Sequence, residues 1–233
     1  MKVDFTSPKS FKPTLMELER INANEYDELQ KLATVYKGEN WRLALTCLFK
    51  AKELLFTKGT APVLQQVTRF PIFLQQAGYF DEAKFELQEL LNNADYYAQN
   101  DVKGIRKNKK LFKQYFKTLY LEHLFDKASL IYKRQKLLQE SDELHQISLG
   151  YSKERAELRQ KIDDIKEKEL MAFEKECEEL SKQYPDLASI DEVIKKAEKQ
   201  NASQNKAKEN SFLEAIVGFV VFILIAYGIY KLF

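Results

Sequence analysis

The chain contains few of the residues that interrupt helices or carry out chemistry. Its 233 residues include only 7 Gly, 5 Pro, 2 Cys and 2 His. Glycine and proline are the residues that a helix tolerates least, whereas Leu, Lys, Glu, Gln and Ala, which are common here, lose little in a helix. We therefore predict an all-α protein.

The two cysteines and two histidines form no recognisable site. Cys47 and Cys177 lie far apart without a partner pattern, which excludes a disulfide framework and fits a reducing compartment. Cys47 shares a helical face with Ala44 and Leu48, so we predict a core thiol and not a nucleophile. His123 and His145 belong to no metal-ligand spacing.

Motifs that bind phosphate or activate a nucleophile are also missing. The sequence has no GxxxxGK[ST], GxGxxG or GxSxG pattern. Its carboxylates lie on regularly charged helical faces, from which no catalytic pair stands out. We expect a non-enzyme with no catalytic residue, no metal site and no cofactor.

Neither sign of charge dominates the chain. Lys and Arg number 37 and Asp and Glu 35, for a net charge of +2. The total charge therefore argues neither for nor against nucleic acid as a partner, and any basic surface must be local. The N-terminus has no apolar core typical of a signal peptide, so we expect the body to stay on the side of the membrane where it is made.

Long apolar runs are absent except for one at the end of the chain. Residues 215–230 carry no charge, and the run is just long enough to cross a bilayer as a helix. We predict a transmembrane anchor at residues 212–233 after a polar linker at 200–211; a buried core helix is less favoured because the run is apolar on every face. Lys206 and Lys208 favour a cytoplasmic body. The layout resembles that of tail-anchored single-pass proteins, in the bacterial inner membrane or alternatively in a eukaryotic organelle membrane.

Three segments of the body share one pattern, in which an aromatic residue precedes a small residue and apolar residues follow at helical spacing. The small residues are Ala44, Ala83 and Ala128. A second apolar stripe precedes each segment: Leu29, Leu32 and Val35; Val67, Phe70 and Leu74; Phe112, Tyr115 and Leu119. The pattern predicts three tandem helix pairs, with Pro71 kinking or breaking the first helix of the second pair.

The second of these pairs, "VTRFPIFLQQAGYFDEAKFELQELL", resembles the tetratricopeptide repeat. Gly78, Phe80 and Ala83 stand where that family has its turn glycine, its aromatic residue and the small residue of its second helix. The spacing between the small residues is longer than in the family. The resemblance covers Glu25 to Leu138 and implies a domain of antiparallel helix pairs, which we assign to residues 25–150 after a lead-in at 1–24.

A run of basic residues extends from Lys103 to Lys117, with no acid before Glu122. On a helix, Arg106, Lys110, Lys113 and Lys117 share one side, which we call the basic ridge, and Phe112, Phe116, Leu119 and His123 share the other. The ridge is either a binding surface or a solvated face without a partner.

The resemblance gives the ridge a role, because first helices of tetratricopeptide repeats line a concave groove that in some members holds an acidic C-terminal peptide. Groove positions fall here on Lys110, Lys113 and Lys117, joined by Arg69, Gln65, Thr68 and Ile72 of the second pair. The first pair offers Tyr26, Leu29 and Ala33 at matching places, which departs from a full carboxylate clamp.

Residues 151–199 are rich in charge, with acid-first pairs spaced four apart that favour an exposed helix. A thin apolar stripe includes Leu158, Ile162, Ile165 and Phe173, with one step that breaks a strict heptad. We predict a long helix laid along the repeats; the alternative is a coiled coil that forms a homodimer through residues 152–183.

These features favour a membrane-tethered, non-catalytic adaptor whose groove binds an acidic or extended segment of a partner protein. The alternative is a membrane-surface or envelope-organising protein that docks its basic ridge on anionic lipid and self-associates through its charged helix. Nonspecific nucleic-acid binding is the weakest of the three.

Overall fold

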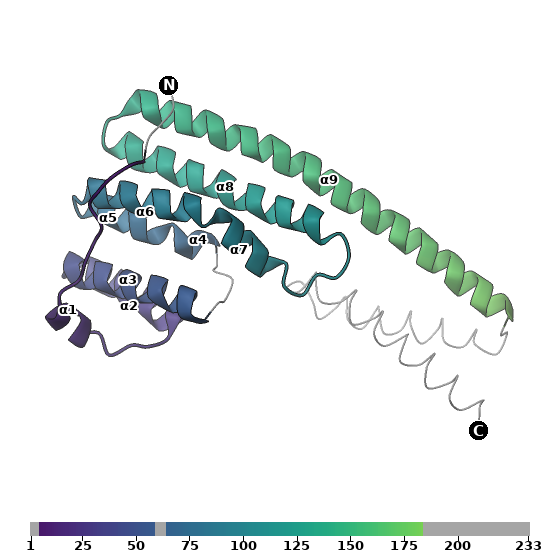
Figure 1. Ribbon diagram of the computed structural model, residues 1–233, viewed down its shortest axis with the longest axis horizontal. Coiled ribbons are helices and arrows are strands. Elements are labelled where there is room, and N and C mark those ends of the chain that lie inside the picture. The colour runs from purple at the N-terminus through teal and green to yellow at the C-terminus, as the bar shows by residue number, and fades with distance from the viewer. Residues whose placement is uncertain (1–4, 59–63, 184–233) are drawn as a thin grey trace. The chain divides into compact units, whose positions relative to one another are not determined.

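The computed structural model describes residues 5–58 and 64–183, in which every regular element is an α-helix (Figure 1). The described part of the chain therefore confirms the all-α prediction. The helices are α1 (Leu15–Glu19), α2 (Tyr26–Lys37), α3 (Trp41–Lys58), α4 (Leu64–Val67), α5 (Arg69–Gln76), α6 (Phe80–Asn92), α7 (Ala94–Asp101), α8 (Lys109–Arg134) and α9 (Leu138–Gln183).

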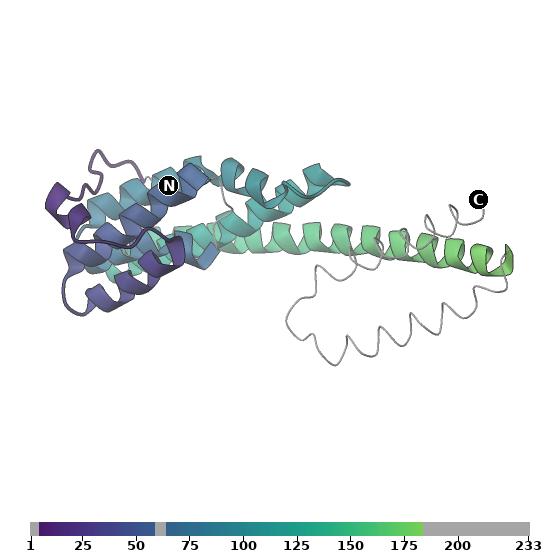
Figure 2. The same ribbon diagram turned by 90° about the horizontal axis from the view of Figure 1, so that it is seen from below.

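The helices up to Lys166 form one compact unit of neighbouring hairpins. Helix α2 packs on α3, α5 on α6, and α7 on α8. Helices α8 and α9 run antiparallel (Figures 1 and 2). Ser141 is hydrogen-bonded to Ser129 near the turn between them, and farther along Gln114 donates a hydrogen bond to Glu154. Short connections between amphipathic helices favour this arrangement, because each apolar stripe is buried against its neighbour in sequence.

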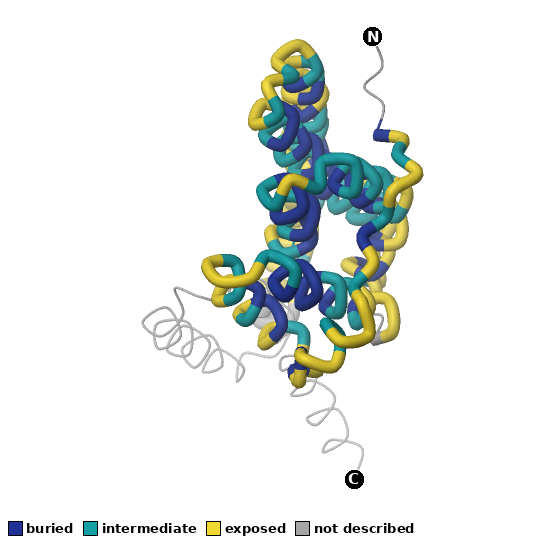
Figure 3. The backbone as a smooth tube through the Cα atoms, turned by 90° about the vertical axis from the view of Figure 1, so that its left-hand side faces the viewer, coloured by how far each residue is buried: buried dark blue, intermediate teal, exposed yellow. Residues whose placement is uncertain are grey.

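The small residues of the repeating pattern lie where helices approach closely. Ala44, Ala83 and Ala128 are each 0% exposed. Ala44 and Ala83 belong to a core cluster shared by α2, α3, α5 and α6, and Ala128 belongs to a second cluster shared by α6, α7, α8 and the start of α9. In Figure 3 the buried residues line the inward faces of these helices.

In the second pair, the helix break and the helix end occur where the sequence predicts them. The first helix is divided into α4 and α5 at Thr68, because the ring of Pro71 would meet the carbonyl of Val67 and Pro71 lacks the N–H of a helical bond. Gly78 has φ of +87°, and the N–H of Tyr79 donates to the carbonyl of Leu74 over 2.8 Å. This is a Schellman end to α5, in which a left-handed residue is required.

The third predicted helix pair is wrong. Phe112, Tyr115 and Leu119 lie on the same continuous helix, α8, as Ala128 and Tyr132. No glycine or proline lies between Lys109 and Arg134, so nothing in the local sequence ends the helix. The antiparallel neighbours of α8 are α7 before it and α9 after it, and α9 already begins at Leu138, within the predicted repeat domain.

The predicted lead-in is a strap that crosses the hairpins (Figure 1). Phe5 is 3% exposed and contacts the rings of Phe125 and Tyr132. Phe11 is also 3% exposed and joins the other core cluster. The strap thus links both clusters with two aromatic side chains.

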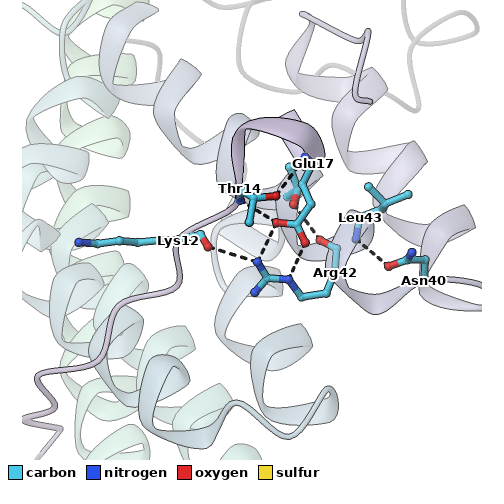
Figure 4. A network of polar contacts seen from close by, with 7 residues as sticks. Lys12, Thr14, Glu17, Asn40, Arg42 and Leu43 are labelled. Atoms are coloured by element: carbon cyan, nitrogen blue, oxygen red, sulfur yellow. Dashed lines mark hydrogen bonds and ion pairs between the residues drawn. The ribbon is translucent and has the colours of Figure 1, made fainter. Parts of the chain in front are cut away.

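Short helix α1 fixes the end of this strap (Figure 4). Thr14 and Glu17 form a capping box, in which the Glu17 carboxylate accepts from the Thr14 N–H over 2.7 Å. The same carboxylate accepts from the Nε and Nη2 of Arg42 on α3, at 2.7 Å each. The Arg42 guanidinium is the largest influence that lowers the pKa of Glu17, to about 2.

The charged part of α9 begins within the first compact unit, which extends to Lys166. Leu158 and Ile162 are 3% and 6% exposed, so the first part of the thin apolar stripe is buried. In the second unit, which begins at Glu167, Leu170 and Met171 are exposed. Burial of Leu158 and Ile162 agrees with a helix laid along its own chain more than with a dimer seam at these positions.

Within residues 5–58 and 64–183, no helix is both long enough and apolar enough to cross a membrane. The predicted linker at 200–211 and anchor at 212–233 lie outside the described residues.

Candidate binding groove

A polar groove lies between α2 and the α4–α5 segment. Its lining residues come from one face of α2 and from both sides of the helix break at Thr68, and its volume is about 250 Å³. The residues are Asp27, Gln30, Lys31, Thr34, Gln66 and Arg69. The α2 members follow the helical spacing of one surface stripe, next to the apolar stripe that packs on α3.

Arg69 is held across the groove by neutral groups of α2. Its Nη1 donates to the carbonyl oxygen of Gln30 at 3.0 Å and to Gln30 Oε1 at 2.7 Å, and its Nη2 donates to Thr34 Oγ1 at 2.7 Å. The guanidinium also lies over the ring of Phe73, 5.2 Å from its centroid. These contacts fix the orientation of a planar cation.

No carboxylate among the described residues pairs with Arg69, although the side chain is half-buried. Burial lowers the pKa of its guanidinium, with a smaller opposing effect from Tyr26. Withdrawing a cation from water without an anion is costly, and neutral acceptors repay only part of that cost. The groove therefore presents a positive charge suited to an incoming anion.

A smaller cavity shares two lining residues, Gln30 and Gln66, with the groove. Its free volume of about 20 Å³ has room for roughly one water molecule. Lys52 and Glu86 face it and form an ion pair over 2.7 Å. Burial raises the pKa of Tyr26, which also lines the cavity, to about 12.

The predicted binding residues separate into groups. Arg69 lines the groove; Gln65 is exposed on α4; Thr68 is buried; Ile72 is half-buried and packs against both core clusters. Leu29 and Ala33 are 0% exposed in the core, because the stripe that carries them packs on α3. Those two residues cannot contact a ligand, which corrects their assignment to groove positions.

The basic ridge is a separate surface whose members differ. Lys113 and Lys117 lie 3.7 and 2.8 Å from the carboxylate of Asp95 on α7. Lys110 is exposed in the first turn of α8, and Arg106 precedes that helix instead of lying on it. Arg69 bonds to Gln30 and Thr34 of α2, whereas Lys113 and Lys117 pair with Asp95 of α7, so the groove and the ridge do not share their polar contacts.

Sequence reasoning missed Asp27, Gln30, Lys31, Thr34 and Gln66. The four α2 residues have helical spacing, but a polar stripe on an amphipathic helix usually marks only its solvated face. The feature that distinguishes this stripe from an ordinary solvated face is its contact with Arg69, which lies 39 positions from Gln30 in the sequence.

Cys47 is buried, and burial raises the pKa of its thiol to about 11, so it is held as a thiol at neutral pH. No three His, Cys, Asp or Glu side chains gather as a metal site would require in the part of the chain that the structure describes. The side chain of Cys177 lies outside that part.

The helix break that separates Gln66 from Arg69 is supported by a histidine. Thr68 Oγ1 lies 3.0 Å from Nε2 of His123 on α8. Burial is the main cause that lowers the pKa of His123, followed by Lys127, while Asp126 and Glu122 oppose the shift. The folded state thus favours the neutral imidazole.

We expect acid to weaken the fold through His123. Because its pKa is lower in the folded state, the unfolded chain binds more protons, and stability falls as the pH drops below the ordinary value of 6.5. Urea unfolding of the full chain at about pH 8 and about pH 5.5 measures the loss. His123→Gln should reduce the loss between these pH values, whereas His145→Gln, an exposed control, should leave it unchanged.

No protein-family model, no curated protein and no solved structure matches this chain.

Proposed function

We propose that this protein is a non-catalytic adaptor that binds an acidic, extended segment of a partner protein in the groove between α2 and α4–α5. The observation that carries the proposal is Arg69, half-buried, oriented by Gln30 and Thr34, and unpaired with any carboxylate of the described residues. The resemblance to tetratricopeptide repeats, which use such grooves for peptides, supports the same use here.

An acidic side chain or a C-terminal carboxylate of the partner would supply the anion that Arg69 lacks among the described residues. The Nε–H of Arg69 makes no hydrogen bond within the described chain, so a carboxylate can accept from it and from the neighbouring Nη2. Lys31 adds a second cation at the rim, while Asp27 disfavours a wholly acidic ligand. We therefore expect one or two acids in the bound segment.

We propose further that residues 212–233 anchor the adaptor in a membrane with its body in the cytoplasm. The support is the uncharged run at 215–230 and the basic flank at Lys206 and Lys208. A tether raises the effective concentration of a groove and a membrane-bound partner without any new contact.

Peptide binding to the full chain in mild detergent tests the groove. A fluorescent pool of extended peptides containing Asp or Glu should bind more tightly than a matched pool with Asn and Gln. Arg69→Gln should weaken the acidic pool by roughly 10- to 100-fold, as expected for a charged hydrogen bond of about 1.5–3 kcal/mol. Rising salt should weaken it as well.

Two controls locate the effect. Arg134→Gln removes an exposed arginine at the end of α8 and should leave affinity unchanged. A triple variant with Gln at Lys110, Lys113 and Lys117 should lose less affinity for the acidic pool than Arg69→Gln does. Equal binding of acidic and neutral pools, or full affinity in Arg69→Gln, would contradict the groove; a loss confined to the triple variant would move the site to the ridge.

A further inference from the structure

The connection from α7 to α8 gathers positive charge at one corner of the molecule. Five basic residues occupy positions 103–110, and all five are exposed. They are Lys103, Arg106, Lys107, Lys109 and Lys110. The chain has no acid between Asp101 and Glu122. We call residues 103–110 the basic corner.

Ion pairs distinguish this corner from the rest of the predicted ridge. Asp95 neutralises part of the charge of Lys113 and Lys117. Arg106, Lys109 and Lys110 have no carboxylate partner among the described residues. The positive charge available to another molecule is therefore concentrated at the corner and decreases along α8.

The start of α8 adds to this charge instead of offsetting it. Asn108, the N-cap, has φ of +54° and makes no side-chain capping bond, and the first turn contains no acid. Helix N-termini carry partial positive charge and favour acids, yet Lys109 and Lys110 occupy this one. An anion bound at the corner would offset this repulsion.

We propose that the basic corner is a docking surface for anionic phospholipid headgroups, bound by Arg106, Lys109 and Lys110. The proposal rests on the anchor suggested for residues 212–233 and not on the peptide groove. An anchored body meets the bilayer surface at high effective concentration, where each basic residue strengthens binding to anionic lipid by roughly fivefold. A nucleic acid has no such tether, and the net charge of +2 attracts it little.

Lysine labelling on vesicles tests the corner. Full-length protein is inserted into preformed vesicles of phosphatidylcholine, with or without phosphatidylglycerol, and labelled with a membrane-impermeant amine reagent. Lys103, Lys109 and Lys110 should react severalfold more slowly only when phosphatidylglycerol is present, and high salt should restore their reactivity. Lys133 and Lys136, exposed at the other end of α8, serve as internal controls and should not change.

Matched triple variants assign the effect to the corner. Changing Arg106, Lys109 and Lys110 to Gln should abolish the lipid-dependent protection of Lys103. The same change at Lys133, Arg134 and Lys136 should preserve it, because these side chains lie beyond the far end of the same helix or in its last turn. If labelling of Lys109 and Lys110 is equal with both lipids while the chain resists carbonate extraction, the corner is not a lipid surface.

Two other outcomes also overturn the proposal. A chain that carbonate extracts from the vesicles has no anchor, and the docking surface fails with it, while peptide binding through Arg69 is unaffected. Equal protection of Lys109 and Lys110 by DNA or by an acidic peptide in the absence of lipid would show a general polyanion site.

Discussion

Replacing Phe11 with alanine should destabilise the compact unit by about 3–5 kcal/mol, the range found for removing a buried aromatic ring. Phe11 contacts the rings of Phe49, Phe70 and Tyr79, with centroids 6.4, 5.8 and 6.1 Å away. The guanidinium carbon of Arg42 lies over the Phe11 ring, 4.7 Å from the ring centroid. Its removal leaves a cavity where the strap meets two hairpins.

Urea unfolding of the full chain in mild detergent measures this loss. Leu15→Ala is the matched control, because Leu15 follows in the same segment but is 78% exposed, and it should change stability by less than about 0.5 kcal/mol. A loss below about 1 kcal/mol for Phe11→Ala would mean that the strap does not hold the hairpins together in solution.

Lys52→Met should also cost about 3–5 kcal/mol, since it leaves a buried carboxylate without its cation. Glu86 has a side chain 4% exposed and pairs with Lys52 at 2.7 Å. Burial already raises the pKa of Glu86, while Lys52 opposes that shift. Without Lys52 the carboxyl should take up a proton more readily in the folded state.

The pH dependence of Lys52→Met has a definite sign. A raised folded pKa means that the folded chain binds more protons than the unfolded chain, so stability falls as the pH rises from the ordinary Glu value of 4.5 to the folded value. The variant should thus lose least in acid, relative to the wild type.

A second substitution tests the cause. Adding Glu86→Gln to Lys52→Met removes the buried charge and should recover part of the stability at neutral pH. Lys9→Met, which breaks an exposed pair with Asp81, is the control and should leave the unfolding midpoint unchanged. If the double variant, Lys52→Met with Glu86→Gln, is as unstable as Lys52→Met at every pH, the loss comes from packing of the lysine stem and not from charge.

The helix pairs α2–α3 and α4–α6 were predictable because local signals agree there. Apolar spacing marks the buried faces, Gly78 ends α5 in a left-handed conformation, and Pro71 divides the helix before it. Between Lys109 and Arg134 the pattern of an aromatic followed by a small residue recurs without any breaker, and the chain forms one helix, α8. The repeating motif predicted a turn there that the backbone had no reason to make.

Other features have no local signal. Phe5 and Phe11 lie in an irregular segment without periodicity, so the sequence offers no reason to bury them in two different core clusters. Arg69 was singled out as a basic residue of the second pair, yet its neighbours could not be named, because they depend on how α2 packs beside α5.

By itself, the sequence determined the helical class of the described chain, the burial of Ala44, Ala83 and Ala128, and the helix break shortly before Pro71, because propensity, periodicity and backbone geometry act over a few residues. Only the tertiary structure decided which charges are paired. It placed Asp95 beside Lys113 and Lys117 and left Arg69 among neutral groups of α2. Such pairings join residues 18 to 39 positions apart, and they are set by helix packing, which short-range spacing does not encode.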